Sequence, residues 1–167
     1  MWHKIFIIGI IFIIGFLQVS FIQSLPAPWH HVNLMLATIT FLAFRRTAWR
    51  LWSAALIFGL ILDLYSFYLF GVVAASIVFI SIINRLLYLN FFTNRALMSF
   101  MAMGFLNVVA YSLIIRLISL TQNSYWPPFS TVIVNMFWST ILTEALVIVF
   151  FVVQQMHYRR NQIHSHG

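Results

Sequence analysis

Residues 51–83 read LWSAALIFGLILDLYSFYLFGVVAASIVFISII and contain one charged side chain, Asp63. As a single helix this run would measure about 50 Å at 1.5 Å per residue, whereas the hydrocarbon core of a bilayer is only about 30 Å thick. A water-soluble core would not need an apolar run of this length. We therefore expect two membrane-spanning helices, separated by a turn between Leu64 and Phe70.

The rest of the chain follows the same pattern. Apolar residues make up 63% of the sequence, and only two residues are acidic. Apolar runs recur between short polar or basic breaks, and most are about as long as a bilayer crossing requires. The sequence predicts an all-α polytopic membrane protein, one integral domain over residues 1–167. Its six expected spans lie roughly at 5–25, 32–44, 49–64, 71–89, 96–118 and 130–153, and a basic cytoplasmic tail is expected at 154–167.

Two of these spans need comment. The first begins with the basic residues His3 and Lys4, as a signal peptide does, but Pro26 and the residues after it do not form a cleavage site, so we expect it to be retained. The second span is short. It is accommodated by little tilt, by local thinning of the bilayer, or by an earlier start at Trp29.

The distribution of basic residues indicates the orientation. The net charge is +7, but the nine Lys and Arg residues lie at span ends rather than in one patch, so the charge does not indicate nucleic-acid binding. With six spans, all of them except Arg116 lie on one face of the membrane. Because Lys and Arg are enriched on the cytoplasmic side, we expect both termini in the cytoplasm.

Three charged residues within expected spans, away from their basic inner ends, need an explanation, because a charge there costs at least about 2.5 kcal/mol to insert. Asp63 and Arg116 both lie towards the outer ends of their spans. They either pair with one another or reach interfacial water separately. Glu144 lies in the inner half of the last span, where Arg50 or Arg85 could approach it. It is either a proton or cation relay or part of a helix-packing surface.

Small or uncharged polar residues recur at helical spacing within three of the spans, which is typical of interhelical contacts. These sets are Asn33, Ala37 and Thr40; Gly104, Asn107 and Tyr111; and Asn135, Ser139 and Thr143.

The sequence shows no catalytic or cofactor motif. There is no cysteine, and the histidines, His30 and His31 among them, have no carboxylate or thiolate close to them in the sequence. Phosphate-binding glycine loops, serine elbows and paired carboxylates are also missing from the sequence. We therefore expect no metal, no cofactor and no enzymatic activity.

The segment 58–66, FGLILDLYS, followed by Phe70 and Gly71, resembles the signature of the MreD family of bacterial rod-shape-determining membrane proteins. That signature is a glycine, three residues, aspartate, leucine, one residue and serine, with a later glycine. The length, the number of spans and the order of features also resemble this family over essentially the whole chain.

The resemblance implies a non-catalytic subunit of the cell-wall elongation (rod) complex, which maintains cell shape, in the bacterial cytoplasmic (inner) membrane. Its implied partners are an MreC-like bitopic membrane protein, a RodA-type glycosyltransferase and a class B penicillin-binding transpeptidase, with the MreB filament bound indirectly. Gly59 and Asp63 share a helical face, so the glycine would let a partner backbone approach beside the acid. The candidate interaction residues are Gly59, Asp63, Ser66, Gly71, Arg116 and Glu144.

The MreD family is also similar in architecture to the six-span substrate-binding components of energy-coupling-factor vitamin transporters. This similarity raises a second hypothesis, a subunit of a small-molecule transporter. The outer loops 64–70 and 121–129, with Arg116, Tyr125 and Trp126, would then cap a ligand pocket, although the same residues also suit an interfacial belt. A generic membrane scaffold is a third hypothesis.

Overall fold

A computed structural model describes residues 2–44, 48–66, 70–90, 97–122 and 128–163 of the chain. Within these ranges it contains six α-helices and two short 3-10 turns, and no strand. The α-helices are α1 (Trp2–Ser20), α2 (Leu34–Ala43), α3 (Ala48–Tyr65), α4 (Val72–Asn90), α5 (Leu97–Gln122) and α6 (Phe129–Ile163). The 3-10 turns η1 (Ile22–Ser24) and η2 (Trp29–His31) connect α1 to α2.

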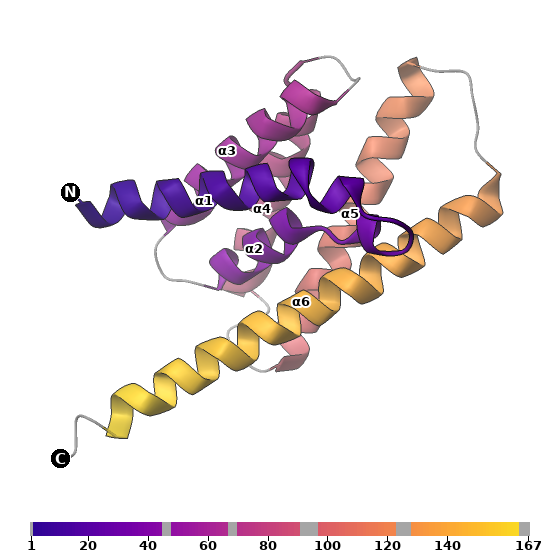
Figure 1. Ribbon diagram of the computed structural model, residues 1–167. Coiled ribbons are helices and arrows are strands. Elements are labelled where there is room, and N and C mark those ends of the chain that lie inside the picture. The colour runs from indigo at the N-terminus through magenta and orange to yellow at the C-terminus, as the bar shows by residue number, and fades with distance from the viewer. Residues whose placement is uncertain (1, 45–47, 67–69, 91–96, 123–127, 164–167) are drawn as a thin grey trace.

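Successive helices reverse direction, so that the two chain ends lie at the same end of the molecule, on the left of Figure 1. Among the described residues, five segments are long and apolar enough to cross a bilayer. They are Ile5–Ser24, Ala48–Tyr65, Val72–Asn90, Leu97–Ile118 and Ser130–Val153. The protein is therefore an all-α polytopic membrane protein, as the sequence predicted. The division of the 51–83 run is also confirmed, because α3 ends at Tyr65 and α4 begins at Val72.

The expected second span is a short helix at the centre of the bundle. α2 has ten residues and is therefore only about 15 Å long, half the thickness of the hydrocarbon core. It is not among the segments long enough to cross on their own. The turn η2 and two further residues lead into it, so the chain returns across the bundle partly as irregular backbone.

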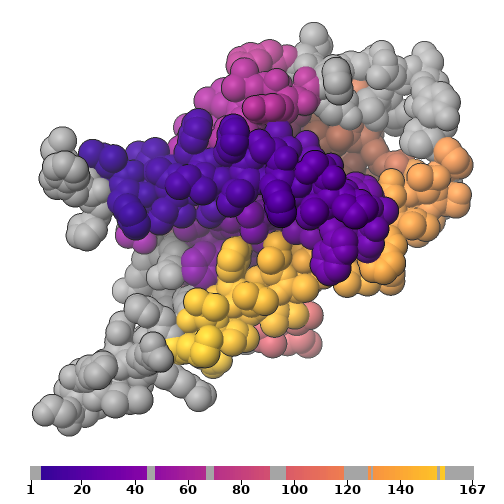
Figure 2. Space-filling model, viewed as in Figure 1, coloured from indigo at the N-terminus to yellow at the C-terminus, as the bar shows by residue number. Residues whose placement is uncertain are grey.

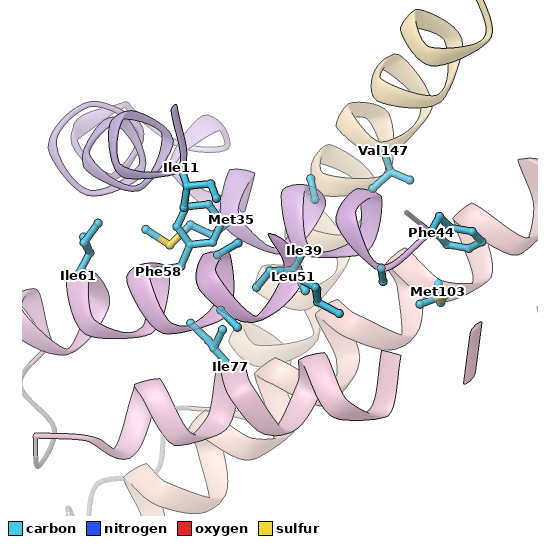
Figure 3. Close-up of a cluster of buried hydrophobic side chains, with 14 of the residues drawn as sticks. Ile11, Met35, Ile39, Phe44, Leu51, Phe58, Ile61, Ile77, Met103 and Val147 are labelled. Carbon is cyan, nitrogen blue, oxygen red and sulfur yellow. The ribbon is translucent and has the colours of Figure 1, made fainter. Parts of the chain in front are cut away.

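The other helices surround α2. Met35 and Ile39 of α2 are fully buried and lie among side chains from the surrounding helices (Figure 3). Those labelled in the figure are Ile11 of α1, Leu51, Phe58 and Ile61 of α3, Ile77 of α4, Met103 of α5 and Val147 of α6. Irregular backbone at membrane depth is tolerated only where protein covers it, and this central position provides that cover.

The segment 154–167, expected as a basic cytoplasmic tail, largely continues the last helix. Helix α6 continues past Val153 to Ile163, through most of the segment that we expected to be a tail. No glycine or proline occurs between Gln154 and Ile163 to end the helix, and glutamine, methionine and arginine are good helix formers. Polar composition marks where the helix leaves the hydrocarbon, but it does not mark where the helical hydrogen bonds stop.

Candidate functional site

Asp63 lies where α3 meets the start of α4, and its carboxyl group caps that helix. The backbone N–H of Val73 donates to Oδ1 at 2.9 Å, and the N–H of Ala74 donates to Oδ2 at 3.0 Å. Asp63 is only 4% exposed. The first N–H groups of a helix have no partner within the helix, so Asp63 satisfies two of them in a buried place.

Gly71 explains why the cap comes from α3. Its carbonyl accepts the first helical bond of α4, from the N–H of Ala75 at 2.9 Å, so Gly71 occupies the N-cap position. Its φ of +93° is a conformation that favours glycine. An N-cap side chain would normally accept from the second or third N–H of the helix, but glycine has none. Asp63 supplies the missing acceptor.

Gly59 brings the two helices close enough for this contact. A Cβ added at Gly59 would lie 2.6 Å from the Cα of Ala74 and 2.9 Å from its Cβ, so only glycine fits this approach. Gly59 lies one turn before Asp63 on the same face of α3. The partner backbone that the sequence led us to expect beside the acid is therefore α4 of the same chain.

Ser66 completes the α3 end of this corner. Its hydroxyl and its N–H both donate hydrogen bonds to the carbonyl oxygen of Asp63, at 3.2 and 3.3 Å. We call the unit formed by Gly59, Asp63, Ser66, Gly71 and Ala74 the α3–α4 corner. The structure thus places the four motif residues of the sequence in one intramolecular unit, whose polar groups are used within the chain.

Arg116 does not join this corner. It lies on α5, and α3 and α5 are not in contact within the described part of the chain. Both oxygens of Asp63 already accept backbone N–H groups from α4. The described contacts therefore give no support to the pairing alternative, and they join Asp63 to the backbone of α4. Two local backbone donors satisfy the acid without a partner from a distant helix.

Glu144 lies at a second close helix approach, between α6 and α5. Its carboxyl group fills the space beside Gly104, where an added Cβ would lie 3.0 Å from Cδ and closer still to Oε1. Both carboxyl oxygens are buried, and they have no hydrogen-bond partner among the described residues. The described structure therefore shows neither Arg50 nor Arg85 bonded to this acid, and it gives Glu144 a packing position.

One predicted interhelical contact joins α5 to α2. The amide of Asn107 donates to the hydroxyl of Thr40 at 2.7 Å, and that hydroxyl donates to the carbonyl of Leu36. Both polar residues are buried. This bond confirms an interhelical contact for Thr40 and Asn107, one residue from each of the two sets.

The start of α2 depends on a residue that the sequence reasoning missed. Gln18 of α1 accepts from the N–H of Leu34 at 2.7 Å and donates to the carbonyl of Val32 at 3.0 Å. The Asn33 side chain accepts from the N–H of Leu36, and the hydroxyl of Thr143 on α6 accepts from the N–H of Asn33. Side chains from three segments thus satisfy the irregular backbone here. The available signal was a glutamine within the first apolar run.

We expect Gln18→Leu to destabilise the protein by about 2 kcal/mol, because it leaves a part-buried N–H and a part-buried carbonyl without partners. The measurement is the free energy of unfolding of the detergent-solubilised protein, titrated with SDS. Gln23→Leu is the matched control, since Gln23 is an exposed glutamine in η1. Equal stability of the two variants would show that Gln18 does not support α2.

The two histidines before α2 lie next to each other. The His30 and His31 rings lie 3.8 Å apart, and burial lowers the pKa of His31, with a smaller effect from His30. Among the residues that the structure describes, no three His, Cys, Asp or Glu side chains come together as metal ligands would. Tyr125 and Trp126, two of the residues expected to cap a ligand pocket, lie outside the described residues.

No family model, no curated protein and no solved structure matches this chain.

Proposed function

We propose that this protein is a non-catalytic subunit of the bacterial cell-wall elongation complex, of the MreD type, in the cytoplasmic membrane. It would bind an MreC-like bitopic protein and, directly or through it, a RodA-type glycosyltransferase and a class B penicillin-binding transpeptidase. The single observation that carries the proposal is the α3–α4 corner. The residues that match the MreD signature form one unit, in which each has a distinct physical task.

The contacts in the corner give a structural reason for each glycine and for the aspartate of the MreD-like signature. Gly59 permits the close approach, Asp63 caps α4, and Gly71 adopts the positive φ at the turn. The close approach and the positive φ favour glycine at positions 59 and 71, and the cap favours a side chain with a hydrogen-bond acceptor at position 63. A chance match of sequence letters would not be expected to place all three in mutually dependent contacts.

The outer face of the corner is available to a partner. While the polar groups turn inwards, Leu64, Tyr65 and Phe70 are all more than half exposed. A membrane protein without catalytic groups can act by presenting such surfaces to neighbouring helices and by holding partners in one orientation. The corner fixes where these apolar side chains lie, because it sets both the angle and the spacing of α3 and α4.

The test is purification of a tagged copy from native membranes in mild detergent, with bound proteins and small molecules identified by mass spectrometry. An unrelated tagged membrane protein of similar size is the control. We expect the MreC-like protein together with the glycosyltransferase or the transpeptidase. Recovery of paired ATPases or of a bound vitamin would instead establish the transporter alternative.

A second arm tests whether the exposed face of the corner contributes. Replacing Leu64 and Phe70 together by alanine leaves the buried contacts of Asp63 and Gly59 in place. We expect unchanged abundance in the membrane and a loss of co-purified partners. Retention of all partners by this double variant would move the binding surface away from the corner.

A further inference from the structure

The two acidic side chains of this protein lie in opposite surroundings. Asp63 accepts two backbone N–H groups, which stabilise the ionised form of a carboxyl group. Both carboxyl oxygens of Glu144 are also buried, but neither has a hydrogen-bond partner among the described residues. The sequence contains no other aspartate or glutamate. The structure thus provides for a charge at Asp63 and makes no such provision at Glu144.

Glu144 lies well inside the membrane. It comes 14 positions after Ser130 and nine before Val153, the two ends of the last span. At 1.5 Å per residue these separations are about 21 and 14 Å, which is further than a glutamate side chain reaches. Lipid tails offer no hydrogen bond. Its carboxyl group therefore depends on the protein for any polar contact.

Contacts beside Glu144 fix the side of α6 that faces the bundle. The hydroxyl of Thr143 accepts from the N–H of Asn33, and Val147, one turn further on, is buried. Figure 2 shows the orange and yellow residues of α6 at the surface, below α1, so another side of this helix faces away from the bundle. The Glu144 carboxyl group lies on the inward side, against Gly104 of α5. A rotation of α6 that turned Glu144 outwards would also break the contact of Thr143.

Within the described structure, no ionisable side chain is hydrogen-bonded to this carboxyl group. The elements packed against α6 are α2, α5 and η2. Their ionisable residues are His30, His31, Tyr111 and Arg116. Arg116 lies 12 positions beyond Gly104, about 18 Å along α5. On α6 itself, no other ionisable residue lies between Phe129 and Met156. An ionised Glu144 would therefore be a buried charge without a bonded counter-charge.

We propose that Glu144 is a proton-binding site, whose carboxylate takes up a proton from water and holds it at neutral pH in the contact between α5 and α6. A neutral carboxyl group costs far less to bury than an unpartnered carboxylate, which loses its hydration and gains nothing in return. Gly104 makes the site, because its missing side chain leaves the space that the carboxyl group fills. Loss of the proton would drive the carboxylate out of this space, so the bound proton also keeps α5 and α6 together. The proposal does not depend on the proposed function.

Infrared spectroscopy of the purified full-length protein tests the proposal, because a protonated carboxyl group has a carbonyl stretching band that a carboxylate lacks. The natural chain and Glu144→Gln are compared at neutral pH, in a detergent without carbonyl groups. We expect their difference spectrum to contain one protonated-acid band, which moves in heavy water. In the natural chain alone, this band should disappear only at alkaline pH, a result that does not depend on how the variant folds. Carboxylate bands at neutral pH in its place would overturn the proposal.

Gly104→Ala tests whether the contact between α5 and α6 makes the site. The added Cβ would collide with the carboxyl group of Glu144, a movable side-chain end, so the variant displaces the acid without changing it. We expect the protonated-acid band to weaken at neutral pH. Gly9→Ala, in open space on α1, is the matched control and should leave the band unchanged. A band of unchanged strength in Gly104→Ala would overturn the assignment of the site to this contact.

Dicyclohexylcarbodiimide, an apolar reagent that enters bilayers, detects the same proton in native membranes. A carboxylic acid adds across a C=N bond of the reagent, with its oxygen going to carbon and its proton to nitrogen, so the reaction requires the protonated form. Gln23→Glu supplies a reference acid at an exposed position. A carboxyl group with the usual pKa of about 4.3 is protonated in only about one molecule in 500 at pH 7, so we expect at least about tenfold more adduct on Glu144 than on the introduced acid. Equal labelling of the two acids, measured by mass spectrometry, would overturn the proposal.

Discussion

Asp63→Ala should cost the protein about 3 to 4 kcal/mol of unfolding free energy, the largest loss that we expect from any single polar substitution. The variant removes two hydrogen bonds to a carboxyl group and leaves the N–H groups of Val73 and Ala74 without an acceptor. Gly71 cannot compensate, because it has no side chain. The measurement is an SDS titration of the purified protein, followed by its helical circular dichroism.

Asp63→Asn separates the cap from the mere presence of a polar group. The amide keeps one acceptor but turns an NH2 donor towards a backbone N–H, so we expect a loss of about 2 kcal/mol. Ser66→Ala is the control within the same turn. Among the described residues the Ser66 hydroxyl donates to the Asp63 carbonyl alone, so its removal should cost less than about 1 kcal/mol. If Asp63→Ala were as stable as Ser66→Ala, Asp63 would not cap α4.

Gly59→Val should cost about 3 kcal/mol, because the new side chain meets backbone and not the movable end of another side chain. The added Cβ alone would lie 2.6 Å from the Cα of Ala74. The helices must therefore separate, and the separation also pulls the N–H groups of α4 away from Asp63. Overpacking of this kind typically costs about 1–3 kcal/mol, and the weakened cap adds to it.

Two other glycines provide matched controls for the Gly59 prediction. Gly9 lies within α1 with open space around its Cα, so Gly9→Ala should be neutral or slightly stabilising through its higher helix propensity. At Gly15 the nearest atom to an added Cβ is Cδ1 of Ile61, a movable side-chain end, so Gly15→Ala should fall between the two. A ranking in which Gly59→Val is no worse than Gly15→Ala would contradict the close approach of α3 and α4.

These experiments also decide how the motif residues contribute to function. If Asp63 and Gly59 act only by building the corner, their variants lose abundance, helix packing and partners together. The double alanine variant of Leu64 and Phe70 should lose partners alone. A stable Asp63→Asn protein that had lost its partners would instead place the acid in the interface itself, as the sequence reasoning first proposed.

The sequence by itself determined the helices of this protein and most of their ends. Apolar runs of bilayer length predict spans because hydrocarbon thickness sets the number of residues that a helix needs. That argument divided the 51–83 run at the correct place, although the run contains no proline. It also predicted that the second span would be short. The number and length of the helices depend on the composition of each segment by itself, so they can be predicted from the sequence alone.

Only the tertiary structure decided which polar group meets which. Reasoning from charge left Asp63 either paired with Arg116 or in contact with interfacial water, whereas its carboxyl group caps α4. Every residue except proline has a backbone N–H, so no sequence pattern could identify the two that Asp63 binds. The same holds for Gln18, whose partners are the backbone of Val32 and Leu34. The central position of α2 followed from packing among five other helices. Such contacts join segments far apart in the chain, and their geometry exists only once the helices have assembled.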